Sequence, residues 1–407
     1  MIKTADALRT RIVLLGLRNA GKSSLMNNIF EKDISIVSEL PGTTTDPVAR
    51  AMELESLGPV TVIDTAGLDD EGSVGRERIR KTIERSESAD IHIIVSRIDR
   101  APSEDEIKTA DVIRAGKGLL LVALTFSDYP PSAGKLEWVS GFTSCRVDNI
   151  SGKGIGELKK ILISFGSKTS FEPSPLEGLV REGDLVVLVT PIDLAAPKGR
   201  LIMPQVETIR DCLDRDCAAL VTKERELKSF YDSLSVRPRL VITDSQAFHK
   251  AAADIPPDQM LTSFSILFAR KKGELSEFIK GITEIRKDKG RPKVLVMEAC
   301  SHHRQADDIG TVKIPRLFRQ LVNPDAEFEF TRILPEPDEL SKYSMIIHCA
   351  ACMITRKTML SRLEKIKNSG TPVTNYGLFL GWANGLLPRA LEPFEDIYMK
   401  WKDFQFS

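Results

Sequence analysis

Short apolar runs alternate with polar or amphipathic stretches through the first part of the chain, between residues 11 and 165. Each run has the length of a β-strand, and the stretch that follows is long enough for a helix. This rhythm is typical of βαβ units, so we expect a mostly parallel sheet with helices on both of its faces. The expected strands are Ile12–Leu15, Val60–Ile63, Ile91–Val95 and Leu119–Leu124.

The alternation continues after a polar, proline-containing stretch, Ser167–Leu176, which we expect to be a linker. A charged turn at Lys287–Pro292 divides the remainder into two segments. In the first of these segments we expect strands at Leu185–Val189, Ala218–Val221, Leu240–Thr243 and Ser263–Phe268, and helices at Gln205–Asp214, Lys223–Leu234 and Glu274–Arg286. In the second segment we expect strands at Val294–Met297, Met345–Ile347 and Pro372–Thr374, and helices at Ile314–Val322 and Thr358–Lys367. The residue pattern shows no convincing internal repeat.

These segments indicate an α/β protein of three domains. We expect an N-terminal domain over residues 1–168 that contains a mostly parallel sheet, followed by two smaller α/β domains over residues 177–287 and 290–407. The length of 407 residues agrees with this division.

Composition narrows the classes of function. Lys and Arg together number 57, as do Asp and Glu, and this balance argues against bulk electrostatic binding to nucleic acid or to anionic lipid. No apolar run is long enough to cross a bilayer, and we recognise no secretion signal. With no such signal, the six cysteines indicate a reducing cytoplasm more than a disulfide scaffold.

The first expected strand runs directly into a phosphate-loop motif. Residues 16–23, GLRNAGKS, fit the pattern G-x-x-x-x-G-K-[ST] between a strand and a helix. Its glycines let backbone N–H groups surround phosphates at a helix N-terminus. Lys22 is expected to reach the β- and γ-phosphates, and Ser23 to ligate Mg²⁺. The nucleotide-binding residues expected in this loop are Gly16, Asn19, Ala20, Gly21, Lys22, Ser23 and Ser24.

Two further motifs follow in the order that a GTPase requires. Asp64 ends a strand and begins the sequence D-T-A-G, so it is expected to hold the Mg²⁺ shell, while the N–H of Gly67 senses the γ-phosphate. Thr44 lies between the motifs, in the sequence P-G-T-T-T-D, and is the candidate second Mg²⁺ contact. Leu68 stands where many GTPases place a glutamine that orients water, so we expect slow intrinsic hydrolysis.

The pattern G-x-x-N-A-G-K-S-S-L-x-N with P-G-T-T-x-D resembles the translation-factor-class GTPases, which include tRNA-modification and ribosome-assembly enzymes. The resemblance implies that Asn19 helps to bind a monovalent cation, usually K⁺, whose charge replaces part of that of an arginine finger. The residues to which we assign catalytic roles are Lys22, Asn19, Thr44 and Gly67.

The base-recognition element departs from the usual N-K-x-D. The chain reads Thr125-Phe126-Ser127-Asp128 after the strand Leu119–Leu124. Asp128 is still suited to accept hydrogen bonds from guanine N1 and N2, whereas Thr125 is shorter than asparagine and Phe126 is suited only to stacking or packing. A related sequence, Ser96-Arg97-Ile98-Asp99, comes too early and is expected to end the preceding strand. We therefore expect binding of GTP and GDP with a guanine preference that the motif supports only in part.

A second group of chemistry-bearing residues lies near the C-terminus. Cys300 and His302 follow the strand Val294–Met297, and His348, Cys349 and Cys352 follow the strand Met345–Ile347. The carboxyl ends of strands are where α/β sheets build sites, so two strands of one sheet can bring these ligands together. Three thiolates suit an iron–sulfur cluster, with His302, His348, Glu298, water or an external molecule as the fourth ligand. Residue types alone leave zinc open, because Cys₃His is a common zinc set.

With both sites considered, the chain resembles the HydF family, the maturation GTPases of [FeFe]-hydrogenases. The distinctive signature is C-x-H…H-C-x-x-C, formed by Cys300, His302, His348, Cys349 and Cys352. Other family-like stretches are Asp184–Gln205, Val241–Ala247, Leu261–Ala269, Glu298–His303 and Thr374–Gly377. The resemblance implies a GTPase domain, a dimerisation domain and a [4Fe-4S]-binding domain, and it favours the iron–sulfur interpretation over zinc.

The resemblance also implies a role and partners. A homodimeric cytoplasmic scaffold would receive a transient diiron precursor from two radical-SAM maturases and deliver it to apo-[FeFe]-hydrogenase. The implied cofactors are GTP or GDP, Mg²⁺, K⁺ and the [4Fe-4S] cluster, with no nucleic acid or membrane as a partner.

Two alternatives from other classes remain at this point. One is an RNA- or ribosome-linked K⁺-dependent GTPase with a structural zinc domain, which predicts a basic patch in the C-terminal part. We see no such patch in the sequence. The other is a GTP-gated redox protein, which predicts a fully ligated cluster with no exchangeable position.

Overall fold

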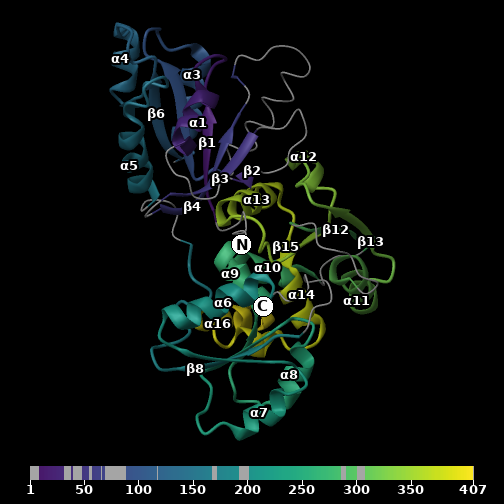
Figure 1. The fold of residues 1–407 in the computed structure, drawn as a ribbon. Helices are drawn as coiled ribbons and strands as arrows, with labels where there is room; N and C mark the ends of the chain where they lie inside the picture. Colours follow the sequence, from purple (N-terminus) through teal and green to yellow (C-terminus); the bar gives the residue numbers. More distant parts are fainter. Residues whose placement is uncertain are drawn as a thin grey trace. The chain divides into compact units, whose positions relative to one another are not determined.

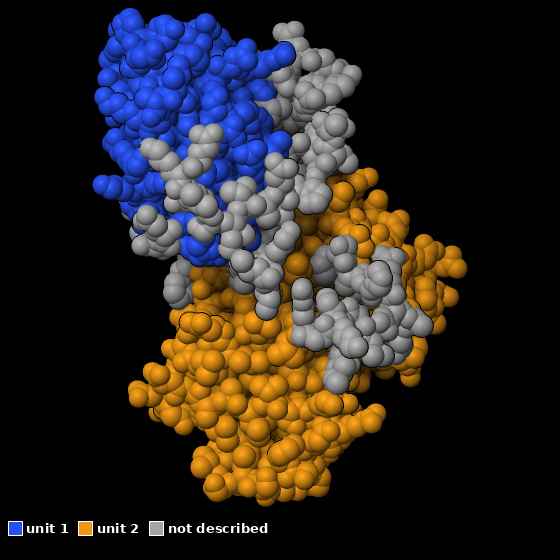
Figure 2. Space-filling view, in the orientation of Figure 1, with its two compact units in different colours: residues 1–171 blue, residues 172–407 orange. Residues whose placement is uncertain are grey.

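The computed structural model describes residues 9–31, 38–39, 48–54, 57–65, 67–68, 89–116, 118–166, 172–191, 201–285, 290–299 and 308–406. The chain divides into two compact units, Met1–Phe171 and Glu172–Ser407, which Figure 2 shows in separate colours. In the described part of the chain, no helix combines the length and the apolar character needed to cross a membrane.

The first unit contains a seven-stranded sheet in the order β2-β3-β4-β1-β5-β6-β7. The strands are β1 (Thr10–Leu15), β2 (Ser38–Glu39), β3 (Val48–Leu54), β4 (Gly58–Asp64), β5 (Ile91–Arg97), β6 (Leu119–Thr125) and β7 (Thr143–Arg146). Pairing is parallel throughout except at β2–β3 and β3–β4. All four strands expected here are confirmed. The antiparallel strand β3 was not expected, because Arg50 and Glu53 interrupt its apolar residues.

Helices cover both faces of this sheet, as the pattern predicted (Figure 1). Successive residues of β1 point to opposite faces. Ile12 and Leu14 pack with apolar residues of α1 (Lys22–Glu31) and α5 (Ile155–Gly166). Val13 and Leu15 pack in a separate cluster with residues of α3 (Glu104–Ala115). The short helix α4 (Ala133–Val139) contributes Lys135, whose buried ammonium lies 3.1 Å from Glu106 of α3.

The second unit contains two parallel sheets of four strands, in the orders β11-β10-β8-β9 and β13-β12-β14-β15. The first comprises β8 (Leu185–Val189), β9 (Ala218–Thr222), β10 (Leu240–Thr243) and β11 (Leu261–Ser263). The second comprises β12 (Lys293–Met297), β13 (Glu327–Thr331), β14 (Met345–His348) and β15 (Val373–Asn375). In each sheet the first strand in sequence lies between the second and the third, and the fourth lies outside the third. The two sheets therefore have the same topology.

The likeness extends to single hydrogen bonds. Thr190 N donates to Thr222 O at 2.8 Å in the first sheet, and Glu298 N donates to Thr331 O at 3.0 Å in the second. Each fourth strand also runs directly into a helix whose N-cap is the last strand residue, Ser263 or Asn375. The second unit is thus a structural repeat that the residue pattern does not reveal.

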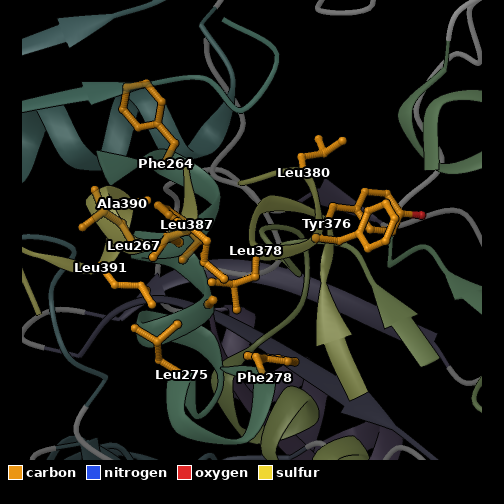
Figure 3. Packing of buried hydrophobic residues seen from close by; sticks show 14 of the residues in the cluster. Phe264, Leu267, Leu275, Phe278, Tyr376, Leu378, Leu380, Leu387, Ala390 and Leu391 are labelled. Atoms are coloured by element: carbon orange, nitrogen blue, oxygen red, sulfur yellow. The ribbon is translucent and has the colours of Figure 1, made fainter. Parts of the chain in front are cut away.

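The helices of this unit enclose one shared core. They are α6 (Met203–Asp214), α7 (Leu227–Ser233), α8 (Phe248–Asp254), α9 (Phe264–Lys272), α10 (Leu275–Glu284), α11 (Ile314–Leu321), α12 (Pro337–Leu340), α13 (Arg356–Ser369), α14 (Tyr376–Ala383), α15 (Leu387–Leu391) and α16 (Glu395–Phe406), with a π-helical turn at Ile309–Lys313. Figure 3 shows side chains of α9, α10, α14 and α15 in one cluster.

Three sequence expectations need correction here. The stretch Ser263–Phe268 is not a strand, because β11 ends at Ser263, whose hydroxyl accepts from Ile266 N at 3.3 Å and starts α9. Helix α7 begins at Leu227, four residues after the expected Lys223. Leu176, assigned to the linker, is fully buried in the core of the second unit. The other helices and strands expected in this unit are confirmed to within a few residues.

Candidate nucleotide and cluster sites

The phosphate loop connects β1 to α1 and needs glycine at two positions. Gly16 has φ +149°, and a Cβ there would lie 2.2 Å from Val95 O. Gly21 has φ +93°, and a Cβ there would lie 2.7 Å from the side-chain amide of Asn149. Lys22 is almost fully buried, and its Nζ donates to Gly16 O at 3.0 Å and Leu17 O at 2.8 Å. The loop therefore holds the ammonium group against its own backbone, where phosphate oxygens bind in this motif.

Ser23 and Asp64 meet at the edge of this loop. The Ser23 hydroxyl donates to Asp64 Oδ2 at 2.5 Å, while the buried Oδ1 has no hydrogen-bond partner among the described residues. Burial raises the pKa of Asp64, although the Ser23 hydrogen bond and the Lys22 charge oppose this shift. A hydroxyl beside a carboxylate with an unsatisfied oxygen is a donor set that Mg²⁺ accepts. These residues therefore fit a magnesium ion.

The segment after β4 is tied to the phosphate loop. Leu68 N donates to Gly16 O at 3.2 Å, and the Thr65 hydroxyl donates to Leu14 O at 2.6 Å. Gly67 is buried between these two anchors. The structure thus brings the D-T-A-G motif to the loop, whereas Thr44 lies outside the described residues.

The base-recognition loop is also anchored to the phosphate loop. Thr125 is fully buried, and its hydroxyl contacts Ala20 O at 2.7 Å and Ser96 O at 3.3 Å. Asp128 is exposed three residues further on. Thr125 stands where the N-K-x-D motif has asparagine. Its short side chain therefore contacts the phosphate loop directly from that position.

A third loop completes this arrangement. The Asn149 side chain donates to Gly21 O at 3.1 Å, and Asn28 of α1 donates to Asn149 O at 2.9 Å. Asp148 accepts hydrogen bonds from the Ser151 hydroxyl and from the N–H groups of Ile150 and Ser151. These hydrogen bonds, mainly that of the Ser151 hydroxyl, lower the pKa of the Asp148 carboxyl. Residue patterns do not indicate that Asn149 contacts the phosphate loop, because the contact joins two strand ends that are distant in sequence.

The C-terminal cysteines follow β14 at the carboxyl edge of the second sheet. Cys349 N donates to Met297 O at 2.9 Å, and the Cys349 sulfur accepts from Ala299 N at 3.1 Å. Both Cys349 and Cys352 are half-buried, and neither is joined in a disulfide to another described cysteine. Glu298 is buried at the end of β12, in the adjacent strand. An N–H donated to a sulfur stabilises thiolate, the form that binds metal.

Cys300 and His302 lie outside the described residues. Within the described part of the chain, no three His, Cys, Asp or Glu side chains converge on a possible metal position. The structure therefore shows two of the expected cysteine ligands on one loop, and it brings Glu298 to the neighbouring strand end.

His348 is completely buried, and both of its ring nitrogens have partners. Arg362 Nη1 lies 3.0 Å from Nε2, and Nδ1 lies 2.8 Å from Cys349 O. Because a guanidinium only donates, Nε2 must accept and Nδ1 must carry the proton. Burial lowers the pKa of His348 to about 4, so the ring is neutral at pH 7. Arg362 and the Cys349 carbonyl therefore engage the two ring nitrogens of His348 in this structure.

The sheet, phosphate loop and D-T-A-G segment define the N-terminal unit as a P-loop GTPase domain. A family model described as "50S ribosome-binding GTPase" matches residues 11–124. Two further models, "Hydrogen maturase F dimerization domain" and "Hydrogen maturase F tetramerization domain", match residues 176–273 and 276–393. The chain has the domain architecture of hydrogen maturase F (HydF) and belongs to that family. Two models named for self-association support an oligomeric protein.

Curated relatives that are themselves GTPases match part of this chain. The tRNA modification GTPase MnmE of Granulibacter bethesdensis is 36% identical over 164 residues, which cover 39% of this chain and 35% of the relative. The GTPase Der of Kosmotoga olearia is 36% identical over 118 residues, covering 28% of this chain and 26% of the relative. The chain thus spans about a third or less of these two relatives.

Solved structures give weaker similarity. The G domain of the iron transporter FeoB from T. maritima has 20% identity and a TM-score of 0.30, covering 39% of this chain and 98% of that one. Era from Aquifex aeolicus has 15% identity and a TM-score of 0.32, covering 60% of this chain and 97% of that one. TM-scores this low add nothing to the family assignment.

Proposed function

We propose that this protein is an [FeFe]-hydrogenase maturation factor. It hydrolyses GTP, holds a [4Fe-4S] cluster, receives a diiron precursor and transfers it to apo-hydrogenase. The observation that carries the proposal is the Cys349 loop, where a thiol accepts Ala299 N–H at 3.1 Å at the carboxyl edge of a parallel sheet. The HydF architecture of the chain supports the same role.

In this proposal Cys300, Cys349 and Cys352 hold the cluster. His348 orients the Cys349 loop and is not a ligand, because Arg362 and Cys349 O engage both of its nitrogens. Glu298, His302 or an external molecule supplies the fourth ligand. When bound, the cluster would offer an iron that accepts a ligand from the incoming precursor.

The GTPase unit would regulate exchange of partners. Ser23, Asp64 and Thr44 hold Mg²⁺, and Asn19 helps to hold K⁺, which raises the slow intrinsic rate of hydrolysis. Switch loops that respond to the γ-phosphate can then change the contacts with other proteins. The partners we propose are two radical-SAM maturases, apo-hydrogenase and a second copy of the chain, in the cytoplasm. The proposed domain limits remain 1–168, 177–287 and 290–407.

The RNA-linked alternative receives no added support. Its basis is the similarity to tRNA modification GTPases, which covers 39% of this chain in the Granulibacter bethesdensis protein. The remaining segments match models of hydrogen maturase F domains.

The test is anaerobic reconstitution of the full chain with iron and sulfide, followed by EPR spectroscopy of the reduced protein with and without cyanide. We expect a cubane signal that shifts with cyanide and is lost in Cys300→Ala and Cys349→Ala. Cys212→Ala is the matched control, because this thiol is fully buried in the same unit, and its signal should equal that of the wild type.

Stoichiometric zinc without a cluster would contradict the proposal and favour a structural zinc domain. A cluster whose signal is unaffected by cyanide would instead indicate a fully ligated electron-transfer centre.

A further inference from the structure

Two neighbouring strand ends lie beside the phosphate loop. Strands β5 and β6 are parallel, with Arg97 in register with Thr125, and Ile98 N donates to Thr125 O at 3.1 Å. Each strand ends in a four-residue sequence that departs from N-K-x-D, residues 96–99 (SRID) and residues 125–128 (TFSD). The pairing therefore places the early, unassigned motif beside the base-recognition loop.

Residues 125–128 lack the lysine of the N-K-x-D motif, and Arg97 of the neighbouring strand provides a cation beside them. Its guanidinium carbon lies 3.7 Å from the centroid of the Phe126 ring. Asp99 fixes the guanidinium through two hydrogen bonds, from Nε at 3.0 Å and from Nη2 at 2.8 Å. A bidentate carboxylate holds the guanidinium plane in one orientation, so the stacking geometry over Phe126 is set before any ligand binds.

Phe126 has a left-handed backbone conformation next to the residue that contacts the phosphate loop. Its φ is +57°, which is uncommon for a residue with a side chain. The preceding residue, Thr125, contacts Ala20 O of the phosphate loop at 2.7 Å. The Phe126 ring is half-buried, packs edge-on against Tyr129 at 6.1 Å, and lies two residues before the exposed Asp128.

We propose that Phe126 is the stacking platform for the purine base and that Arg97 is the residue that positions it. Asp128 accepts hydrogen bonds from N–H donors on the edge of the same base. An aromatic face binds any purine, whereas a hydrogen-bonding carboxylate selects guanine, so Asp128 alone carries the selectivity. This inference concerns the GTPase site and does not depend on the proposed cluster.

The test measures equilibrium binding of GDP, ADP and inorganic tripolyphosphate to the full chain by competition with a fluorescent GDP analogue. We expect Phe126→Ala to weaken GDP and ADP binding by about tenfold, since one base–aromatic stack is removed. Arg97→Ala should weaken both by about three- to tenfold, and the double variant should equal Phe126→Ala. Tripolyphosphate has no base, so its affinity should not change in any variant.

The matched control is Arg114→Ala, which removes a guanidinium 4.9 Å from the Phe142 ring in the same unit. Its affinities should equal those of the wild type. Phe126→Leu keeps apolar bulk without an aromatic face and should behave like Phe126→Ala. The proposal is overturned if GDP affinity stays within about twofold in both Phe126 variants, or if tripolyphosphate binding falls by the same factor as GDP binding.

Discussion

Replacing Thr125 by valine tests whether the base loop is preorganised by the phosphate loop. Valine has nearly the same shape, so the change removes the hydroxyl without creating a cavity in this fully buried site. In the wild type this hydroxyl lies 2.7 Å from Ala20 O and 3.3 Å from Ser96 O, and valine can form neither hydrogen bond. Removing a donor from a buried carbonyl costs about 1–2 kcal/mol.

Part of this cost should appear as weaker nucleotide binding, because the ligand must order two loops that the Thr125 hydroxyl no longer holds together. The full cost would correspond to an increase of about five- to thirtyfold in the Kd for GDP. The assay is titration with a fluorescent GDP analogue, accompanied by thermal unfolding of the full chain. Thr125→Ser keeps the hydroxyl and should stay within about threefold of the wild type.

Ser140→Ala provides a matched control. Its hydroxyl also donates over 2.7 Å, to Glu137 O, but it lies at an exposed helix end in the same unit. We expect no change in Kd or in unfolding temperature for this variant. If Thr125→Val is indistinguishable from Ser140→Ala in both measurements, the Thr125 hydroxyl does not preorganise the site.

Three further predictions concern the metal ions and the core. Because burial raises the pKa of Asp64, an ionised carboxylate destabilises the ligand-free fold above that pKa. Asp64→Asn should therefore raise the unfolding temperature without Mg²⁺ at pH 7, by an amount that shrinks as the pH falls toward the ordinary carboxyl value of 3.8, and should abolish stabilisation by added Mg²⁺ in scanning fluorimetry. We expect the wild-type protein to hydrolyse GTP about tenfold or more faster in KCl than in NaCl, measured by phosphate release, and Asn19→Ala should remove this difference. A Cβ at Gly377 would lie 2.4 Å from Ser265 Cβ, so Gly377→Ala should destabilise the second unit by about 1–3 kcal/mol in urea unfolding, and adding Ser265→Gly should restore it.

The elements that were predictable from sequence are those with a strong local signal. Buried parallel strands such as Leu119–Leu124 are continuous apolar runs, and the phosphate loop needs glycines at fixed spacing. The antiparallel strand β3 lacks such a run, because one of its faces is partly exposed. The start of helix α9 has the pattern of a strand, because residues around much of the helix circumference are buried and the helical period is lost.

The site depends more on contacts between distant residues. His348 beside Cys349 is typical of a metal ligand in sequence, yet Arg362, on a helix further along the chain, engages its Nε2. The contact of Arg97 with Phe126 joins two strand ends that are separate in sequence. Such pairings follow from strand order, which residue patterns do not define. The repeat in the second unit was invisible for a similar reason: equivalent positions, such as Ser263 and Asn375, share a role but not an identity.

In the function that we propose, this GTPase carries a metal fragment to another protein. The most direct test of this function is hydrogen evolution by purified apo-[FeFe]-hydrogenase after incubation with this protein, reconstituted and loaded with a diiron compound that bears CO, cyanide and a dithiolate bridge. We predict that the loaded wild-type protein activates the hydrogenase and that Cys349→Ala, treated identically, does not. Absence of hydrogen evolution with a wild-type protein that demonstrably holds both the cluster and the diiron compound would show that the protein does not deliver the fragment.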